Sequence, residues 1–186
     1  MSGGGHLPGD GDAPVEVLHA GKWLTLKRRG RWEFVERNNP QGAVIIVAVT
    51  PAERVLFVEQ YRVPIRQATI EMPAGLIGDA GHVDDDSVAT AARRELIEET
   101  GWDCARVVPL HSGPSSAGMS TEIMHFVRAL DLRKVGTGGG DATENIVVHE
   151  VPRREADAWL RAMSGKGYSI DPKLFAGLWF LEHGGD

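Results

Sequence analysis

Cysteine is almost missing from this sequence. Of 186 residues only Cys104 is a cysteine. An intramolecular disulfide is therefore excluded, and so is a zinc site built from several thiolates. A chain without disulfides fits a reducing compartment.

Long hydrophobic runs are missing as well. No apolar run approaches the roughly 20 residues of a membrane-spanning helix. The first fourteen residues, MSGGGHLPGDGDAP, contain Gly, Asp and Pro where a signal peptide has a charged start and an apolar stretch. We therefore expect a soluble, cytoplasmic protein with no membrane partner.

An excess of positive charge is also lacking. The formal net charge is -6, and Lys and Arg are scattered without a basic block. Nucleic-acid binding usually needs such a block, so we expect no nucleic-acid partner. What is present, 42% hydrophobic and 25% charged residues, is the range in which a chain of this length buries a core of its own.

The order of residue types divides the chain into three regions. Residues 1–14 are rich in Gly, Asp and Pro, and we expect a disordered tail there because they offer little to bury. Residues 15–42 contain the short β-type runs VEVLHA, KWLTLKR and RWEFVER, which predict an N-terminal strand and hairpin region. Residues 43–186 form the main domain.

The main domain mixes strands and helices. Apolar runs predict strands at 43–49, 54–60, 68–72, 105–111, 123–130 and 145–151. Pro73-Ala74-Gly75 should end one of these strands and begin a loop. Helices are expected at 88–100, at 154–163 and at 172–183, the last with Asp171 as its cap and Pro172 in its first position. The pattern predicts an α+β fold in which helices cover both faces of a mixed sheet.

The helix at 88–100 carries the candidate chemistry. Its apolar stripe includes Ala91, Ala92 and Leu96, with a capping serine before it and Gly101 just past its end. Glu95, Glu98 and Glu99 stand at i, i+3 and i+4, so three carboxylates share one face. Hard oxygen ligands of this kind suit Mg²⁺ or Mn²⁺. The alternative is a solvated acidic face, with Arg93 and Arg94 as its salt-bridge partners.

The segments around this helix resemble the Nudix box. A strand ends at Pro73-Ala74-Gly75, an acidic loop follows, and the helix then carries Arg-Glu-x-x-Glu-Glu-x-Gly from Arg94 to Gly101. The resemblance implies the Nudix fold, an α/β/α sandwich with a mixed central sheet, and hydrolysis at a pyrophosphate. It also implies roles for five residues: metal ligation by Glu95, Glu98, Glu99 and the carbonyl oxygen of Ala74, and orientation of the glutamates by Arg94. Arg94 and Glu98 then belong to the catalytic set.

The spacing departs from the family pattern in one place. Counted back from Arg94, the glycine of the pattern should fall at Ala80, but Gly75 lies five residues earlier. An insertion within GDAGHVDDD explains this and leaves the helix intact. Asp86 stands where the pattern has a glutamate. It either replaces that glutamate or only caps the helix.

Further segments resemble one branch of the family, the ADP-ribose pyrophosphatases. These segments are residues 59–64, residues 70–77 and an N-terminal hairpin with Gly21-Lys22-Trp23 and Trp32-Glu33-Phe34-Val35-Glu36-Arg37. The resemblance implies that the substrate is bound by Trp23, Trp32, Glu33, Arg37, Arg62, Glu71 and Met119. In that reading the tryptophans stack on adenine and the arginines hold phosphates. The branch also implies a homodimer that swaps its N-terminal hairpins. The alternatives are core tryptophans and surface salt bridges.

The general base is sought in the glycine-rich loop GTGGGDATE. In the branch, a glutamate before the last strand activates the attacking water, and Glu144 holds that place here. Asp141 is the rival, and a solvated loop acid is the alternative to both. A flexible loop would let the carboxylate close over the metals.

The resemblance makes ADP-ribose the favoured substrate, cleaved to AMP and ribose 5-phosphate. Ala117 stands where the branch usually has proline, which weakens that choice within the class. ADP-glucose, GDP-mannose and oxidised nucleoside diphosphates are the rival substrates. A nucleotide sensor that does not hydrolyse is the rival from another class.

Overall fold

The structure is a computed structural model that describes residues 10–38, 42–78, 87–140 and 144–184. Its elements follow in chain order: β1 (Val15–Ala20), β2 (Leu24–Arg29), β3 (Trp32–Arg37), β4 (Gly42–Ala48), β5 (Arg54–Arg62), η1 (Val63–Ile65), β6 (Gln67–Glu71), β7 (Ala74–Ile77), α1 (Val88–Thr100), β8 (Trp102–Asp103), β9 (Arg106–Pro114), β10 (Ile123–Leu130), β11 (Arg133–Lys134), β12 (Val147–Pro152), η2 (Arg153–Glu155), α2 (Ala156–Gly165), β13 (Ser169–Ile170) and α3 (Lys173–His183).

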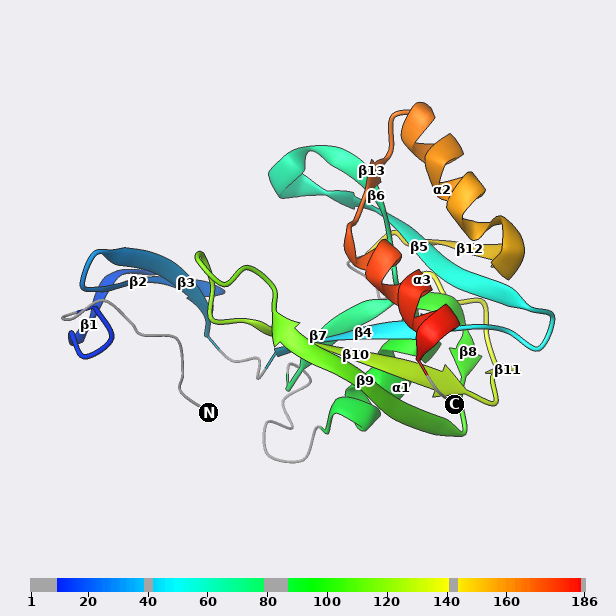
Figure 1. Ribbon diagram of the computed structural model, residues 1–186, viewed down its shortest axis with the longest axis horizontal. Helices are drawn as coiled ribbons and strands as arrows, with labels where there is room; N and C mark the ends of the chain where they lie inside the picture. The colour runs from blue at the N-terminus through cyan, green and yellow to red at the C-terminus, as the bar shows by residue number, and fades with distance from the viewer. Residues whose placement is uncertain (1–9, 39–41, 79–86, 141–143, 185–186) are drawn as a thin grey trace.

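The first three strands form a separate antiparallel sheet, in the order β1-β2-β3, that projects from the rest of the molecule (Figure 1). The loop between β9 and β10 joins it to the body. Val35 on β3 donates its N–H to the Met119 oxygen at 2.8 Å and accepts from the Thr121 N–H at 3.2 Å. The predicted hairpin region is thus a three-stranded sheet fastened to the body through β3.

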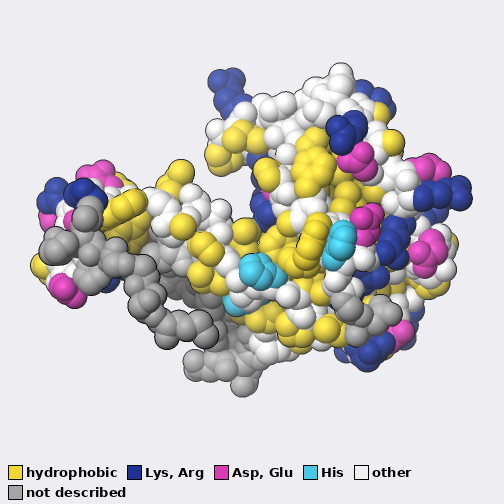
Figure 2. Space-filling model, viewed as in Figure 1, with side chains coloured by type: hydrophobic (Ala, Val, Ile, Leu, Met, Phe, Trp, Pro, Cys, Tyr) yellow, Lys and Arg dark blue, Asp and Glu magenta, His cyan; other side chains and the backbone are white. Residues whose placement is uncertain are grey.

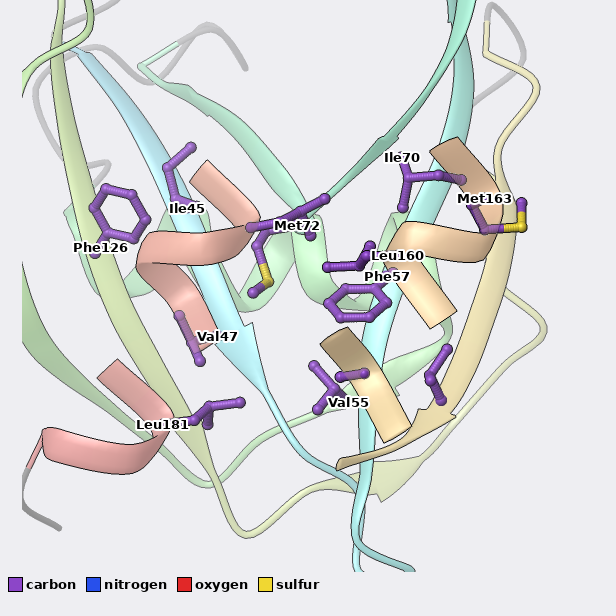
Figure 3. Close-up of a cluster of buried hydrophobic side chains, with 13 residues drawn as sticks. Ile45, Val47, Val55, Phe57, Ile70, Met72, Phe126, Leu160, Met163 and Leu181 are labelled. Carbon is purple, nitrogen blue, oxygen red and sulfur yellow. The ribbon is translucent and has the colours of Figure 1, made fainter. Parts of the chain in front are cut away.

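The body contains two mixed four-stranded sheets. One has the order β7-β4-β10-β9, with β4 and β10 parallel. The other has the order β12-β5-β6-β13, with β6 and β13 parallel. β4 and β5 meet only near their connecting turn, through a bridge between Val49 and Val55. The sheets diverge from that turn, and a hydrophobic cluster fills the space between them (Figure 3).

Alternation along β4 explains why both faces of its sheet are covered. Ile45 and Val47 belong to the cluster that includes residues of α2 and α3. Val44 and Ile46 point the other way and belong to the cluster with α1. Helices therefore lie on both sides of β4, and the α+β sandwich of the Nudix fold is confirmed. The expected central sheet is divided into the two sheets described above.

Local signals set the ends of α1 as expected. The Ser87 hydroxyl accepts from the Thr90 N–H at 3.1 Å and caps the N-terminus. Gly101 caps the other end with φ of 70° in the left-handed region. Between these caps Ala91 and Leu96 are buried against the sheet.

Some expectations need correction at their edges. The segment after Pro73, expected as a loop, contains the strand β7, because residues 74–77 pair with β4. α3 begins at Lys173, one residue later than predicted, although Asp171 Oδ1 still accepts from the Lys173 N–H at 2.8 Å. In the described parts of the chain, no helix has the length and apolar character needed to cross a membrane.

The predictions that fall wholly or partly outside the described residues include those for Asp86, for Asp141 and for the disordered tail at 1–14, of which residues 1–9 are not described. Of the remaining tail, Asp10 forms an ion pair with Arg31 across 3.0 Å.

Candidate active site

A cavity of about 500 Å³ opens where the two sheets of the body meet α1 and the start of α3. Among its lining residues are seven that the sequence singled out: Arg37, Arg62, Glu71, Ala74, Glu95, Glu99 and Glu144. Four of them are acidic and two are arginines, so the cavity offers both ligands for a cation and donors for an anion.

Glu95 is held against the backbone of β7. Arg94 Nη2 donates to Glu95 Oε1 at 3.0 Å and to the Leu76 oxygen at 3.0 Å. A Cβ atom on Gly75 would overlap the Glu95 carboxyl group. A side chain at position 75 would therefore displace the Glu95 carboxyl group from its present place. The insertion expected within GDAGHVDDD falls almost wholly at residues 79–86, outside the described residues.

Glu99 is the most buried acid in the cavity. Only 3% of it is exposed, and its Oε2 accepts from the Ala74 N–H at 3.0 Å. Burial raises the pKa of Glu99 to about 9, and the nearby charges of Glu95 and Glu144 act in the same direction. Without a cation this carboxyl is therefore neutral at pH 7.

Arg62 and Glu71 form a bidentate pair at the opposite wall. Arg62 Nε and Nη2 lie 2.6 and 2.7 Å from the two oxygens of Glu71, which is only 5% exposed. The hydrogen bonds that Arg62 donates to the Glu71 carboxylate raise the pKa of Arg62. Arg37 Nε donates to Glu122 Oε1 at 2.5 Å. Both guanidinium groups are thus fixed in orientation before any ligand binds.

The structure does not bring every predicted residue to this cavity. Glu98 is exposed on α1 and is not among the lining residues, whereas Glu95 and Glu99 are. Trp23, Glu33 and Met119 are exposed and lie outside it too. Trp32 lines a different cavity, of about 620 Å³, between the N-terminal sheet and the loop at residues 117–121.

Gln60, Asp171 and Lys173 are among the lining residues that sequence reasoning did not assign to the site. Asp171 and Lys173 stand at the start of α3, where the Lys173 ammonium also pairs with the Asp171 carboxylate. The helix-start signal at Asp171-Pro172 gives the position of the helix. It contains no information about which surface the helix end faces.

The donor set fits a hard divalent cation. Glu95, Glu99 and Glu144 interact electrostatically, and their mutual repulsion is what a bound cation would offset. Among the described residues, no three acidic, histidine or cysteine side chains stand close enough to form a ready-made metal group. A cation would therefore have to draw its ligands together.

Comparisons with known proteins agree with this geometry. Relatives include the methanol dehydrogenase activator of Bacillus methanolicus, 35% identical over 121 residues, and the GDP-mannose pyrophosphatase of Escherichia coli (strain K12), 33% identical over 130 residues. The first alignment covers 64% of this chain and 63% of that protein, and the second covers 69% and 67%. The chain thus spans slightly less than two thirds of the Bacillus relative.

The fold is also that of a solved structure described as an ADP compounds hydrolase. The TM-score is 0.69 at 21% identity, and the likeness covers 92% of this chain and 94% of that one, so the resemblance of fold extends beyond the catalytic body. The model of the NUDIX domain matches residues 39–167, which include α1 with its glutamates and every strand of the body except β13. The chain belongs to the Nudix hydrolase family.

Proposed function

We propose that this protein hydrolyses the pyrophosphate bond of a nucleoside diphosphate sugar with Mg²⁺, and that ADP-ribose is its preferred substrate. The observation that carries the proposal is the single cavity in which Glu95, Glu99 and Glu144 face Arg37 and Arg62. A pyrophosphate needs both sets, because its charge must be neutralised and its bridge must be attacked by water.

Nudix hydrolases generally need a divalent metal. Mg²⁺ would be held by Glu95, Glu98 and Glu99 and by the carbonyl oxygen of Ala74, and Mn²⁺ would suit the same oxygens. Glu98 is exposed and would have to turn toward the cavity. When bound, the metal supplies charge for the phosphate oxygens and lowers the pKa of a bound water.

Arg37 and Arg62 would hold the two phosphates. Each guanidinium is already oriented by an acidic partner, Glu122 for Arg37 and Glu71 for Arg62. Binding therefore costs little rotamer entropy at these positions. Glu71 would thus support phosphate binding through Arg62, beyond any direct contact with the ribose.

Glu144 would be the general base. It lines the cavity and lies close enough to Glu99 to influence its titration. It would take a proton from the attacking water as a new oxygen–phosphorus bond forms and the bridging oxygen leaves with the electron pair of the broken bond. With ADP-ribose, the products are AMP and ribose 5-phosphate.

The nucleobase would be bound by Trp23, Trp32, Glu33 and Met119 of a homodimer. Within one chain these residues lie outside the cavity, so they serve the site only if the N-terminal sheet of a second copy, with the loop that contains Met119, reaches it. The exposed fractions of the rings, 70% for Trp23 and 50% for Trp32, support a role at a surface that a partner covers.

GDP-mannose is the second candidate substrate, and the similarity to GDP-mannose pyrophosphatases favours it. The same cavity would cleave either pyrophosphate, because the arginines and carboxylates contact the phosphates and leave the base to other residues.

A substrate panel tests the proposal. ADP-ribose, ADP-glucose, GDP-mannose and ATP are each incubated with the protein in Mg²⁺, and the products are separated by ion-exchange chromatography. We expect the highest kcat/KM for ADP-ribose, with AMP as a product. A higher value for GDP-mannose would transfer the assignment to that substrate, and turnover of ATP alone would overturn the proposed class.

A further inference from the structure

The C-terminal end of α1 is covered by the glycine segment, defined here as Gly138–Gly140. The last carbonyl groups of a helix have no partner within the helix. Here the Gly139 N–H donates to the Glu99 oxygen at 2.8 Å, and the Gly140 N–H donates to the Glu98 oxygen at 3.1 Å. The backbone carbonyl groups of Glu98 and Glu99 therefore bind the glycine segment, while their side chains are the ones expected to bind metal.

Residues before the glycine segment hold the same helix end. The Val135 and Gly136 N–H groups donate to the Gly101 oxygen at 2.8 and 3.0 Å. Lys134 Nζ donates to the Thr100 oxygen at 3.0 Å. Four successive carbonyl groups, those of residues 98–101, are thus satisfied by one stretch of chain from another part of the sequence.

The buried acid Asp103, on β8, also links α1 to β11, the strand that precedes the glycine segment. Asp103 Oδ1 accepts from Arg93 Nε on α1 at 2.6 Å, and its Oδ2 accepts from Arg133 Nη2 on β11 at 2.7 Å. The hydrogen bond from Arg93 holds the pKa of Asp103 well below its usual range. β11, which leads into the glycine segment, is therefore anchored to the helix at neutral pH.

Gly138 must be glycine for this packing. Its φ of 72° lies in the left-handed region. A Cβ atom there would lie 2.7 Å from the Gly101 nitrogen and would overlap the Thr100 carbonyl carbon. Those atoms belong to the backbone of the helix end and cannot yield as a flexible side chain would, so a side chain at Gly138 has to push the two elements apart.

The other end of the glycine segment fixes Glu144. The Ile146 N–H donates to the Gly139 oxygen at 3.1 Å, which brings the chain back toward the segment after Glu144. A Cβ atom on Gly140 would lie 2.7 Å from both the Cβ and the Oε2 of Glu144. The side chain of Glu144 therefore rests on Gly140, in space that only glycine leaves open.

We propose that the glycine segment is a positioning element that fixes the carboxylate of Glu144 relative to Glu95 and Glu99 by docking on the end of α1. Its glycines allow the chain to pack closely against the helix. The glycine segment therefore acts as a rigid spacer and not as a free hinge. The proposal rests on the proposed function, with Glu144 as the base. It assigns a role to Gly138 and Gly140, which touch neither substrate nor metal.

The first test compares two alanine substitutions in the same loop. Gly138→Ala should lower kcat by about 10²-fold, the effect of a misplacement of about 1 Å. KM should change little, because the arginines and the metal still hold the phosphates. Gly136→Ala is the matched control, because the nearest atom to its new methyl group is the Gly101 Cα at 4.0 Å and its N–H is retained. Its kcat should stay at the wild-type value.

The second test repeats the substitution without the base. Glu144→Gln alone should lower kcat by roughly 10² to 10⁴. If Gly138 acts only by positioning Glu144, Gly138→Ala added to Glu144→Gln should change kcat by less than about twofold, the usual error of additivity. A full additional loss would mean that the substitution damages the helix or its metal ligands, and it would overturn the proposal.

Folding and activity controls separate the possible failures. Circular dichroism and the melting temperature report whether Gly138→Ala folds. If it does not, Gly140→Ala replaces it, because the three atoms nearest to that methyl belong to the side chains of Glu144 and Ile146, and it should give the same loss of kcat. A wild-type protein without Mg²⁺-dependent turnover would refute the proposed function itself. An active wild type with equal kcat in Gly138→Ala and Gly136→Ala would refute the positioning role alone.

Discussion

The N-terminal sheet and the body differ in how they are held together. In the described residues before β4, from Asp10 to Asn38, no residue is buried, and the hydrophobic side chains of the sheet lie at its surface (Figure 2). The body has two clusters of buried side chains, one on each face of β4. A three-stranded sheet without a core has little independent stability, so its order must depend on contacts with its surroundings.

This difference separates the two parts of the proposed activity. Apart from Arg37, which ends β3, the residues proposed for metal binding and phosphate binding belong to the body, where a buried core can hold carboxylates and arginines within about 0.5 Å. The residues proposed for the nucleobase are carried mainly by the exposed sheet. Chemistry should therefore depend on the body, and affinity for the base should depend on the sheet and on whatever covers it.

The largest expected effect concerns the body. Glu99→Gln should lower kcat by more than about 10²-fold, because loss of a metal ligand costs more than loss of a partner behind it. Glu182→Gln, an exposed acid on α3, is the control and should leave kcat unchanged. Initial rates at saturating Mg²⁺ measure both. Near-normal turnover in Glu99→Gln would make α1 an ordinary acidic helix.

The next largest effect is on the free energy of unfolding, which should respond differently to substitutions in the body and in the N-terminal sheet. Leu160→Ala removes a fully buried side chain of α2 and should lower the free energy of unfolding by about 2–5 kcal/mol. Leu18→Ala in β1, at a position 36% exposed, should cost less than about 0.5 kcal/mol in a monomer. Urea unfolding at several protein concentrations measures both. In a dimer that covers the sheet, the cost of Leu18→Ala should grow with protein concentration, and a constant small cost would argue against that dimer.

A third prediction concerns the tryptophans of the sheet. Trp23→Ala and Trp32→Ala should each raise KM by about 5-fold to 150-fold, since stacking on a base contributes roughly 1–3 kcal/mol, and kcat should be nearly unchanged. Trp179→Ala, which removes a ring on α3 that is 55% exposed, is the control. If all three variants behave like the wild type, the sheet has no part in binding the base.

Oligomeric state is measured alongside these variants. We expect light scattering to give about twice the 20.2 kDa of one chain. A monomer with full activity would show that the sheet of a second copy is not needed.

The smallest expected effect is the release of one proton from Glu99 when metal binds. Burial raises the pKa of Glu99 to about 9, so the metal-free protein carries a proton there at pH 7 that the unfolded chain has lost. Metal binding must release it, so Mg²⁺ affinity should rise with pH up to about 9. Stability without metal should fall over the same range, because the folded state binds more protons than the unfolded state. Calorimetry in two buffers of different ionisation enthalpy measures the released proton, and identical heats would contradict the assignment.

Local signals carried most of what could be predicted from the sequence. The ends of α1 follow from Ser87 and Gly101, and the alternation in β4 follows from its apolar run, because both depend on neighbours in the chain. Seven of the residues singled out by the Nudix resemblance line the cavity. The resemblance also implied site roles for Glu98, Trp23, Glu33 and Met119, but these residues do not line the cavity of the same chain.

Contacts between distant segments were beyond such reasoning. Lys173 reaches the cavity because β13 pairs with β6 and sets the start of α3 there. The glycine segment looked like a flexible loop because glycine also permits close packing, and composition does not distinguish the two uses. Only the hydrogen bonds to Glu98 and Glu99 reveal which one applies.

The most direct test of the central claim is ³¹P NMR of ADP-ribose incubated with the wild-type protein, with Mg²⁺ and then with excess chelator. With Mg²⁺ we expect the pyrophosphate resonances to be replaced by two phosphomonoester resonances, those of AMP and ribose 5-phosphate. With chelator, or with Glu99→Gln in Mg²⁺, the pyrophosphate resonances should persist. Cleavage that continues unchanged in chelator and in Glu99→Gln would contradict a metal-dependent hydrolase built on α1.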